Sequence, residues 1–357
     1  MTTPLRIAVI GGSGYTGGEL LRLLSLHPNV TITKIVASEK SQGLPISSLL
    51  PNLRNIVDFQ LSGLEPSTIA QDADIIFLAL PHTQSLQPVS EFLSLGKSVI
   101  DLSADYRLKN PNTYEQWYGV PHGFPELLSQ AVYGLPEHHR QEISSSRLVA
   151  VPGCYPTVAI LQLAPLIKQG LLEWETIIID SKSGVSGAGR SPAIGFHFPE
   201  AHEGLHAYKL TTHRHTPEIA QELSHLLPSQ QGTPHKEVPL IFTPHLIPMN
   251  RGMLSTAYAK VKPGITQAII MEAVRQTYGD EYFIRIHSNP DTVNPNNLRG
   301  SNFCDLGYQL DSHTRCLITT GAIDNLVKGA AGQAIQCMNI ICGFTENLGL
   351  TGPGIFP

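Results

Sequence analysis

The chain has 357 residues, of which 41% are hydrophobic and 15% charged, with a formal net charge of −5. Its length favours about two domains, and its apolar content excludes a disordered polypeptide. The acidic balance and the lack of a Lys/Arg run argue against a nucleic-acid or polybasic membrane surface, and no apolar run approaches the roughly 18 residues of a membrane span. Five cysteines without a CxxC pair predict neither a disulfide framework nor a zinc ribbon, but a protein of the reducing cytoplasm.

The first predicted strand, residues 5–10, leads into a glycine-rich turn. Gly12, Gly14 and Gly17 form G-x-G-x-x-G, and leucines with helical spacing follow as far as Pro28. Glycines here let the backbone approach a pyrophosphate, and the helix N-terminus supplies N–H donors. The turn therefore predicts dinucleotide binding. Its expected cofactor contacts are Gly12, Ser13, Gly14, Tyr15, Thr16 and Gly17.

The second predicted strand ends near Ala37 and is followed by Ser38 and Lys40. An NAD site often has an acidic residue at this strand end, to hold the ribose 2′-hydroxyl. A hydroxyl and a cation suit a 2′-phosphate instead, so we expect NADP. Because Glu39 lies between them, a solvated loop is the alternative.

Further strands at 73–80 and 97–101 alternate with helical segments and predict a doubly wound, parallel α/β sheet. Loops at the carboxyl ends of such strands face the ligand. We therefore expect Pro81 and His82 near the cofactor, although His82 could equally be a loop residue without a role.

Cys154 lies in VAVPGCYPT, between a predicted strand at 148–151 and an apolar helix that starts near Pro156 and ends at Gly170. At a helix N-terminus the dipole favours thiolate over thiol, which makes a cysteine reactive. The other cysteines lie in strand-like or apolar segments and are expected in the core. Cys154 is therefore the candidate nucleophile.

A thiolate nucleophile needs an acid–base partner, most often histidine. His215 opens HTPEI, which predicts a helix with Thr216 as N-cap and Pro217 at its first position, so His213 and His215 lie just ahead of that helix. Either histidine could project into a cleft, and their spacing does not decide between them.

The segment from His202 to His206 matches H-E-x-x-H, the pattern of zinc proteases. That site needs a continuous helix to bring both imidazoles to one face, but Pro199 lies just upstream of this segment and Gly204 lies inside it. We expect no metal site, with a zinc protease as the alternative.

Several motifs together resemble a known family. They are GGSGYTGGELLRLL (11–24), LALPH (78–82), DLSADYRL (101–108), VYGLPE (132–137), VPGCYPT (151–157), SGVSGAGR (183–190), HRHTPEI (213–219) and FTPHLIPMNRGM (242–253). In these the chain resembles the N-acetyl-gamma-glutamyl-phosphate reductases, an arginine-biosynthesis family of the semialdehyde-dehydrogenase group.

The resemblance implies a Rossmann domain formed by residues 1–153 and 323–357, with 325–344 as the returning helix. It implies a second, α+β domain at 154–322, with a mixed, largely antiparallel sheet, for catalysis and oligomerisation. It also implies a homo-oligomer, a tetramer or a dimer.

The resemblance further implies an NADPH-dependent reduction of N-acetyl-glutamyl 5-phosphate to the 5-semialdehyde, through a thioester on Cys154. Arg107 and Arg190 would bind the anionic acyl-phosphate substrate, with Tyr208 and Glu218 positioning it or a histidine. The resemblance places Ser183, Gly184, Gly187 and Asn325 near the nicotinamide. A reductase of aspartyl phosphate or of a carrier-linked amino acid is the nearest alternative, and a non-catalytic NADP sensor another.

Overall fold

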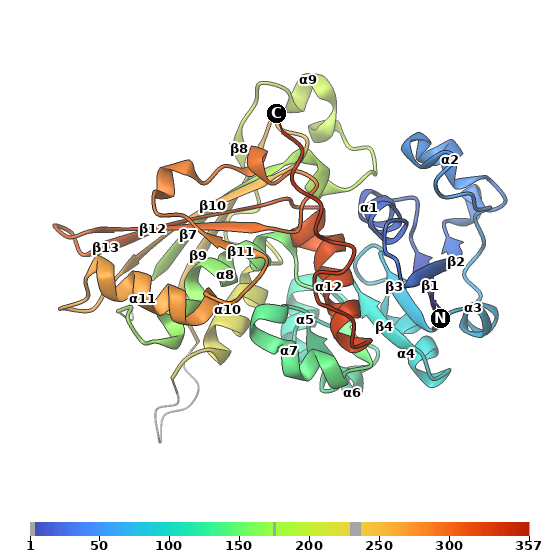
Figure 1. Ribbon diagram of the computed structural model, residues 1–357, viewed down its shortest axis with the longest axis horizontal. Coiled ribbons are helices and arrows are strands. Elements are labelled where there is room, and N and C mark those ends of the chain that lie inside the picture. Colours follow the sequence, from blue (N-terminus) through green and yellow to red (C-terminus); the bar gives the residue numbers. More distant parts are fainter. Residues whose placement is uncertain (1–3, 174–175, 229–236, 357) are drawn as a thin grey trace. The chain divides into compact units, whose positions relative to one another are not determined.

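The computed structural model describes residues 4–173, 176–228 and 237–356. The chain folds as two compact units, Met1–Gly153 with Ala330–Gly352, and Cys154–Gly329 with Pro353–Pro357 (Figure 1). The sequence placed the return to the first unit at residue 323. The segment up to Gly329 and Pro353–Pro357 instead belong to the second unit. Within that unit Asp324 accepts a 2.6 Å hydrogen bond from the Gly300 amide, and the Ile355 amide donates to the Arg299 carbonyl at 2.7 Å. No helix among the described residues is long and apolar enough to cross a bilayer.

In the described residues, the first unit contains a six-stranded sheet with the order β2-β1-β3-β4-β6-β5. Every pair in it is parallel, which confirms the predicted doubly wound sheet. The strands are β1 Leu5–Ile10, β2 Val30–Val36, β3 Ile75–Leu78, β4 Ser98–Asp101, β5 Val132–Tyr133 and β6 Leu148–Ala150.

Parallel strands are covered on both faces, and the continuous apolar runs of this sheet reflect that. Ile7 to Ile10 are all buried, and so are Ile75 to Leu78. The helices are α1 Tyr15–Leu24, α2 Ile46–Leu49, α3 Pro66–Asp72, α4 Leu86–Ser94, α5 Pro111–Tyr118, α6 Pro125–Leu128, α7 Pro136–Ser145 and α12 Gly332–Ile341. Helices α1, α7 and α12 pack together, and α3 packs with α4. Because the strand order reverses between β1 and β3, the turns after these strands flank a switch point, where such sheets bind ligands.

The second unit contains, within the described residues, a seven-stranded sheet with the order β11-β12-β13-β10-β7-β9-β8. Four pairings are antiparallel and two are parallel, which confirms the predicted mixed sheet. The strands are β7 Ile177–Gly184, β8 His206–Ala207, β9 Leu240–Ile247, β10 Met253–Lys260, β11 Ile284–Ile286, β12 Cys304–Asp311 and β13 Cys316–Ile323.

Helix α8, Cys154–Lys168, is the central helix of the second unit and is buried from Tyr155 to Ile167. It packs on β10 and β13, and α10 Thr216–His225 and α11 Gln267–Tyr278 pack against it. Figure 1 shows these three helices on one side of the sheet, with the short α9 Phe198–Ala201 elsewhere. The Gln162 amide donates to Ser255 Oγ on β10 at 3.1 Å, and Tyr278 OH donates to the Leu161 carbonyl at 2.9 Å. The helix that carries Cys154 is therefore fixed to the sheet and to its neighbour.

The expected helix over 325–344 begins later than predicted. Val327–Ala331 forms a π-helical turn, and α12 follows it. The wider turn is already present just before it, where the Gly329 amide donates at 3.0 Å to the Asp324 carbonyl, five residues earlier.

Candidate active site

Cys154 is the first residue of α8, directly after the extended segment Val151–Gly153. The structure therefore confirms its predicted place at a helix N-terminus, where the dipole stabilises a thiolate. All five cysteines are described, and each is an unbridged thiol. Cys304 and Cys337 are buried as expected, whereas Cys316 and Cys342 are partly exposed.

Tyr155, the residue after Cys154, forms an aromatic cluster with His213 and His215. The Tyr155 ring centroid lies 5.6 Å from that of His213 and 5.9 Å from that of His215, and the two imidazoles are 4.8 Å apart. Phe242 on β9 lies 5.3 Å from both Tyr155 and His213. The second unit thus carries Cys154 and both predicted histidines, and the ring of Tyr155, the residue after Cys154, contacts both imidazoles.

Tyr208 joins this cluster through a chain of hydroxyl groups. The Tyr155 hydroxyl donates to the His245 carbonyl at 3.1 Å, and the two tyrosine oxygens are 3.2 Å apart. Because a carbonyl only accepts, the Tyr155 proton is committed to it, so Tyr208 must donate to Tyr155. Burial, with a contribution from negative charge on Cys154, raises the pKa of Tyr208 to about 12. Both phenols therefore stay protonated at neutral pH, and Tyr208 lies within electrostatic range of the sulfur.

His213 is buried and electrically neutral at physiological pH. Burial lowers its pKa to about 4, and the positive charges of Lys209 and Arg214 lower it too. The backbone amide of His215 donates to Nδ1 of His213 at 3.2 Å. The proton of the neutral ring is therefore on Nε2, which makes that nitrogen a hydrogen-bond donor.

Helix α10 begins one residue earlier than the sequence predicted. His215, not Thr216, is the N-cap, because its carbonyl accepts the first helical hydrogen bond, from Ile219 at 3.0 Å. The prediction of Thr216 as the cap was wrong. Glu218, in the first turn, is 1% exposed.

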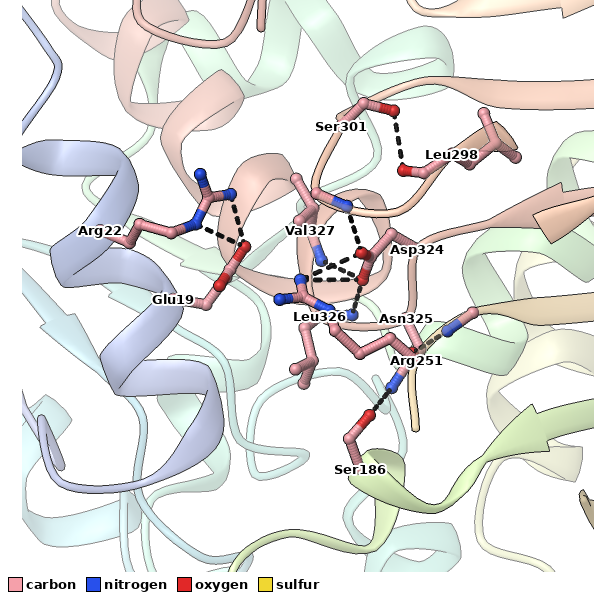
Figure 2. Close-up of polar contacts among 12 residues, drawn as sticks. Glu19, Arg22, Ser186, Arg251, Leu298, Ser301, Asp324, Asn325, Leu326 and Val327 are labelled. Atoms are coloured by element: carbon pink, nitrogen blue, oxygen red, sulfur yellow. Dashed lines mark hydrogen bonds and ion pairs between the residues drawn. The ribbon is translucent and has the colours of Figure 1, made fainter. Parts of the chain in front are cut away.

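The segment 183–190 is a strand end followed by a 3₁₀ turn. Ser183 and Gly184 end strand β7, and Val185–Ala188, which includes Gly187, forms a 3₁₀ turn. The Asn325 amide donates to Ser186 Oγ at 3.0 Å, so the structure brings Asn325 and this turn together (Figure 2).

The two expected substrate arginines belong to different units. Arg107, in the first, is 4% exposed and donates from Nε to the Val151 carbonyl at 2.7 Å and from Nη2 to the Leu102 carbonyl at 2.9 Å. Arg190, in the second, is exposed after the 3₁₀ turn.

The glycine motif occupies the predicted strand-to-helix turn of the first unit. Gly14 is the N-cap of α1, with Tyr15 and Thr16 opening the helix. A Cβ atom at Gly17 would lie 2.3 Å from the Gly11 carbonyl oxygen, so only glycine allows this close approach. The backbone there fits the cradle that a dinucleotide pyrophosphate needs. Ser38 and Lys40 are exposed beyond β2, in and beside a 3₁₀ turn.

Asp105 supports the loop that carries Pro81 and His82, and sequence reasoning missed it. Its carboxylate accepts from the amides of Thr83 at 2.7 Å and Ser85 at 2.9 Å, and from Tyr114 OH at 2.9 Å. The loop is strained, since Thr83 has a φ of 71°. Pro81 and His82 themselves are exposed.

The H-E-x-x-H segment does not form the helix that a zinc protease requires. Helix α9 ends at Ala201, and His206 lies in strand β8. Among the residues that the structure describes, no group of His, Cys, Asp or Glu is arranged to hold a metal ion.

Two family models match the chain. The model described as "Semialdehyde dehydrogenase, NAD binding domain" matches residues 6–146, and that described as "Semialdehyde dehydrogenase, dimerisation domain" matches residues 154–325. The N-acetyl-gamma-glutamyl-phosphate reductases of Geotalea daltonii and Geobacter metallireducens are each 50% identical over 354 residues, which are 99% of this chain and 100% of theirs.

Solved structures share the fold at low identity. Aspartate semialdehyde dehydrogenase II of Vibrio cholerae, complexed with ASA, has a TM-score of 0.72 at 16% identity, covering 96% of this chain and 99% of that one. The Candida albicans aspartate semialdehyde dehydrogenase with NADP has a TM-score of 0.70 at 15% identity, covering 97% and 99%.

Proposed function

The chain belongs to the semialdehyde dehydrogenase family and, within it, to the N-acetyl-gamma-glutamyl-phosphate reductases, and we propose that it reduces N-acetyl-glutamyl 5-phosphate to the 5-semialdehyde, releasing phosphate, in arginine biosynthesis. The observation that carries this is 50% identity over the full length of reductases with that name. The assembly of Cys154 with a histidine pair in one unit supports the chemistry.

Cys154 is the nucleophile in this proposal. Its thiolate attacks the acyl carbon, the carbon–oxygen bond to phosphate breaks, and a thioester forms. Support comes from its position at the start of α8, where the dipole favours the anion. Backbone N–H groups at that helix start can stabilise the oxyanion of the tetrahedral intermediate.

His213 is the hydrogen-bond donor to the reacting oxygen. As the thioester carbon accepts a hydride, its oxygen becomes an alkoxide, which the Nε2–H of His213 stabilises. The carbon–sulfur bond then breaks, giving the aldehyde and restoring the Cys154 thiolate. The neutral, Nε2-protonated ring supports this assignment. His215 fixes that tautomer through its amide.

The substrate-binding residues are Arg107, Arg190, Tyr208 and Glu218. Two backbone carbonyls orient the Arg107 guanidinium, whose planar fork suits a carboxylate or phosphate. Arg190 is the more exposed cation of the two. Tyr208 lies beside His213, with ring centroids 5.5 Å apart, and can contact the substrate there. Glu218 is buried in the first turn of α10 and would position the substrate or a histidine.

The cofactor is NADP, which supplies the hydride when bound in its reduced form. The glycine turn, Gly12 to Gly17, would hold the pyrophosphate, and Ser38 and Lys40 the 2′-phosphate. Pro81, His82, Ser183, Gly184, Gly187 and Asn325 would surround the nicotinamide end. Five unbridged thiols are consistent with work in a reducing cytoplasm.

The second unit mediates self-association, as a dimer or tetramer, through the sheet face opposite α8. Tyr258, Ile178 and Ile241 form a cross-strand row on β10, β7 and β9, and they are 37%, 43% and 51% exposed. Exposed apolar side chains in a contiguous row are typical of interfaces. A second copy is the occupant that the dimerisation-domain match supports.

The test is the reverse reaction, in which the protein is mixed with N-acetylglutamate 5-semialdehyde, phosphate and NADP or NAD. We expect reduced nicotinamide to form, and faster with NADP. Aspartate semialdehyde in a parallel assay tests the nearest alternative substrate. No activity on the acetylated substrate with either cofactor would contradict the proposal.

A further inference from the structure

Asp324 is a fully buried carboxylate directly after β13, and its partners among the described residues are all N–H groups (Figure 2). Arg251 Nη2 lies 3.2 Å from Oδ1 and 3.0 Å from Oδ2. The Gly300 amide donates to Oδ2 at 2.6 Å, and the amides of Leu326 and Val327 donate to Oδ1 at 2.8 and 3.3 Å. One side chain thus joins the turn before β10, the loop before β12 and the start of the π-helical turn.

Asn325, the next residue, is 2% exposed and held by the segments that Asp324 joins. Its Oδ1 accepts from the Gly252 amide at 2.7 Å, and its Nδ2 donates to Ser186 Oγ at 3.0 Å. Gly252 neighbours Arg251, so the ion pair and the Asn325 amide fix the same turn. The orientation of the Asn325 amide therefore depends on the Asp324 contacts.

The π-helical turn Val327–Ala331 lies against the nucleophile. The Asp324 carbonyl accepts from the Gly329 amide at 3.0 Å. A Cβ atom at Gly329 would lie only 2.8 Å from Cys154 Cβ, so the backbone at 329 packs directly on Cys154. A shift of this turn would therefore be transmitted to the sulfur.

We propose that Asp324, paired with Arg251, is a positioning residue for the hydride-transfer step. All of its contacts described above are with protein N–H groups, and it acts by holding Asn325 and the backbone behind Cys154. The inference rests on the proposed function, in which Asn325 lies beside the nicotinamide. A carboxylate is required because every group that these contacts bring to it is a donor, and an asparagine would place an NH₂ group against N–H groups.

The test is Asp324→Asn, assayed with NADPH and with NADPH deuterated at the transferred position. We expect kcat to fall by about tenfold to a hundredfold, because misplacement of the reacting groups by about 1 Å costs that much. The KM for the acyl phosphate should change by less than about threefold, because Asp324 makes no substrate contact. The deuterium isotope effect on kcat should rise, since hydride transfer becomes more strongly rate-limiting.

The matched control is Asp305→Asn. Asp305 is also buried and paired with an arginine, Arg285, at 2.6 Å, with His287 at 2.9 Å, but no contact joins it to Asn325 or Cys154. It should lower the Tm to a similar extent and leave kcat and the isotope effect unchanged. An equal rise of the isotope effect in this control would overturn the proposal, because general softening of the unit would then explain it.

Arg251→Lys keeps the charge and loses the guanidinium fork. If Asp324→Asn does not fold, this variant tests the positioning role instead. We expect a smaller fall in kcat and a correspondingly smaller rise of the isotope effect. A wild-type kcat and isotope effect in a folded variant at 324 or 251 would overturn the inference. Inactivity of the wild-type protein would instead overturn the proposed function, so the two failures are distinguishable.

Discussion

The backbone amide of His215 donates a 3.2 Å hydrogen bond to Nδ1 of His213. This bond assigns the neutral tautomer with its proton on Nε2, and burial lowers the pKa of the ring to about 4. Protonation of Nδ1 would place its N–H group against the His215 amide N–H. The hydrogen bond and the burial therefore both favour the neutral ring. His213 is thereby suited to donate a hydrogen bond to an alkoxide without becoming charged.

The first prediction concerns stability and pH. Since the folded pKa of His213 is about 4 and the ordinary value is 6.5, the unfolded chain takes up the proton first as the pH falls. The free energy of unfolding should therefore decrease between about pH 6.5 and pH 4, by about 3 kcal/mol from this group. Urea unfolding of wild type and His213→Gln at pH 7 and pH 4.5 isolates the effect, because the variant lacks it. Parallel losses in both proteins would contradict the assignment.

The second prediction concerns the nucleophile. Cys154→Ser should reduce turnover by at least about a thousandfold, because a serine hydroxyl is not ionised there, while NADP binding should remain unchanged. Cys342→Ser is the matched control, since burial raises the pKa of that thiol to about 11 and keeps it unreactive. Steady-state rates and NADP titration check both variants. Near-normal turnover of Cys154→Ser would refute the covalent route.

The third prediction concerns the tyrosine pair. Tyr155→Phe removes the donor to the buried His245 carbonyl and the acceptor of Tyr208, and should cost about 1–3 kcal/mol of unfolding free energy. Tyr308→Phe is the control, because within the described residues the buried Tyr308 hydroxyl has no hydrogen-bond partner. That change should be neutral or slightly stabilising. Denaturant unfolding compares them, and equal losses would show that the Tyr155 hydroxyl contacts contribute nothing.

The fourth prediction concerns self-association. Ile178→Lys places a charge in the middle of the Tyr258–Ile178–Ile241 row, and should weaken the oligomer by about thirtyfold or more. Ile56→Lys, at a 62% exposed apolar position of the first unit, should have no effect. Sedimentation equilibrium measures both. An unchanged association constant for Ile178→Lys would show that the interface does not include this row.

Local patterns predicted much of the fold and the core of the site. Short stretches of sequence were enough to predict three elements: the strand at 5–10, the glycine turn after it, and the helix between Pro156 and Gly170. Cys154 was therefore correctly placed at a helix start. The cap of α10 was misplaced because Thr216 and His215 are both compatible with the local sequence, and the backbone conformation of His215 decides.

The parts that sequence did not predict depend on contacts between distant segments. Asp324 acquires its role only when Arg251 and Gly300 meet it, and Asp105 only when the loop at Thr83 folds over it. The π-helical turn comes after a wider turn closed at the Asp324 carbonyl, so its position could not be read from helical periodicity. The hydrogen bond from Tyr155 to the His245 carbonyl likewise joins residues 90 positions apart.

The thioester on Cys154 is the central claim, and a single-turnover reaction without phosphate tests it most directly. The enzyme is mixed with N-acetylglutamate 5-semialdehyde and excess NADP, and the Cys154 peptide is examined by mass spectrometry. Since no phosphate is present to release the acyl group, we expect a burst of about one NADPH per subunit and an N-acetylglutamyl adduct on Cys154. NADPH formation only after phosphate is added, with Cys154 unmodified, would contradict the account.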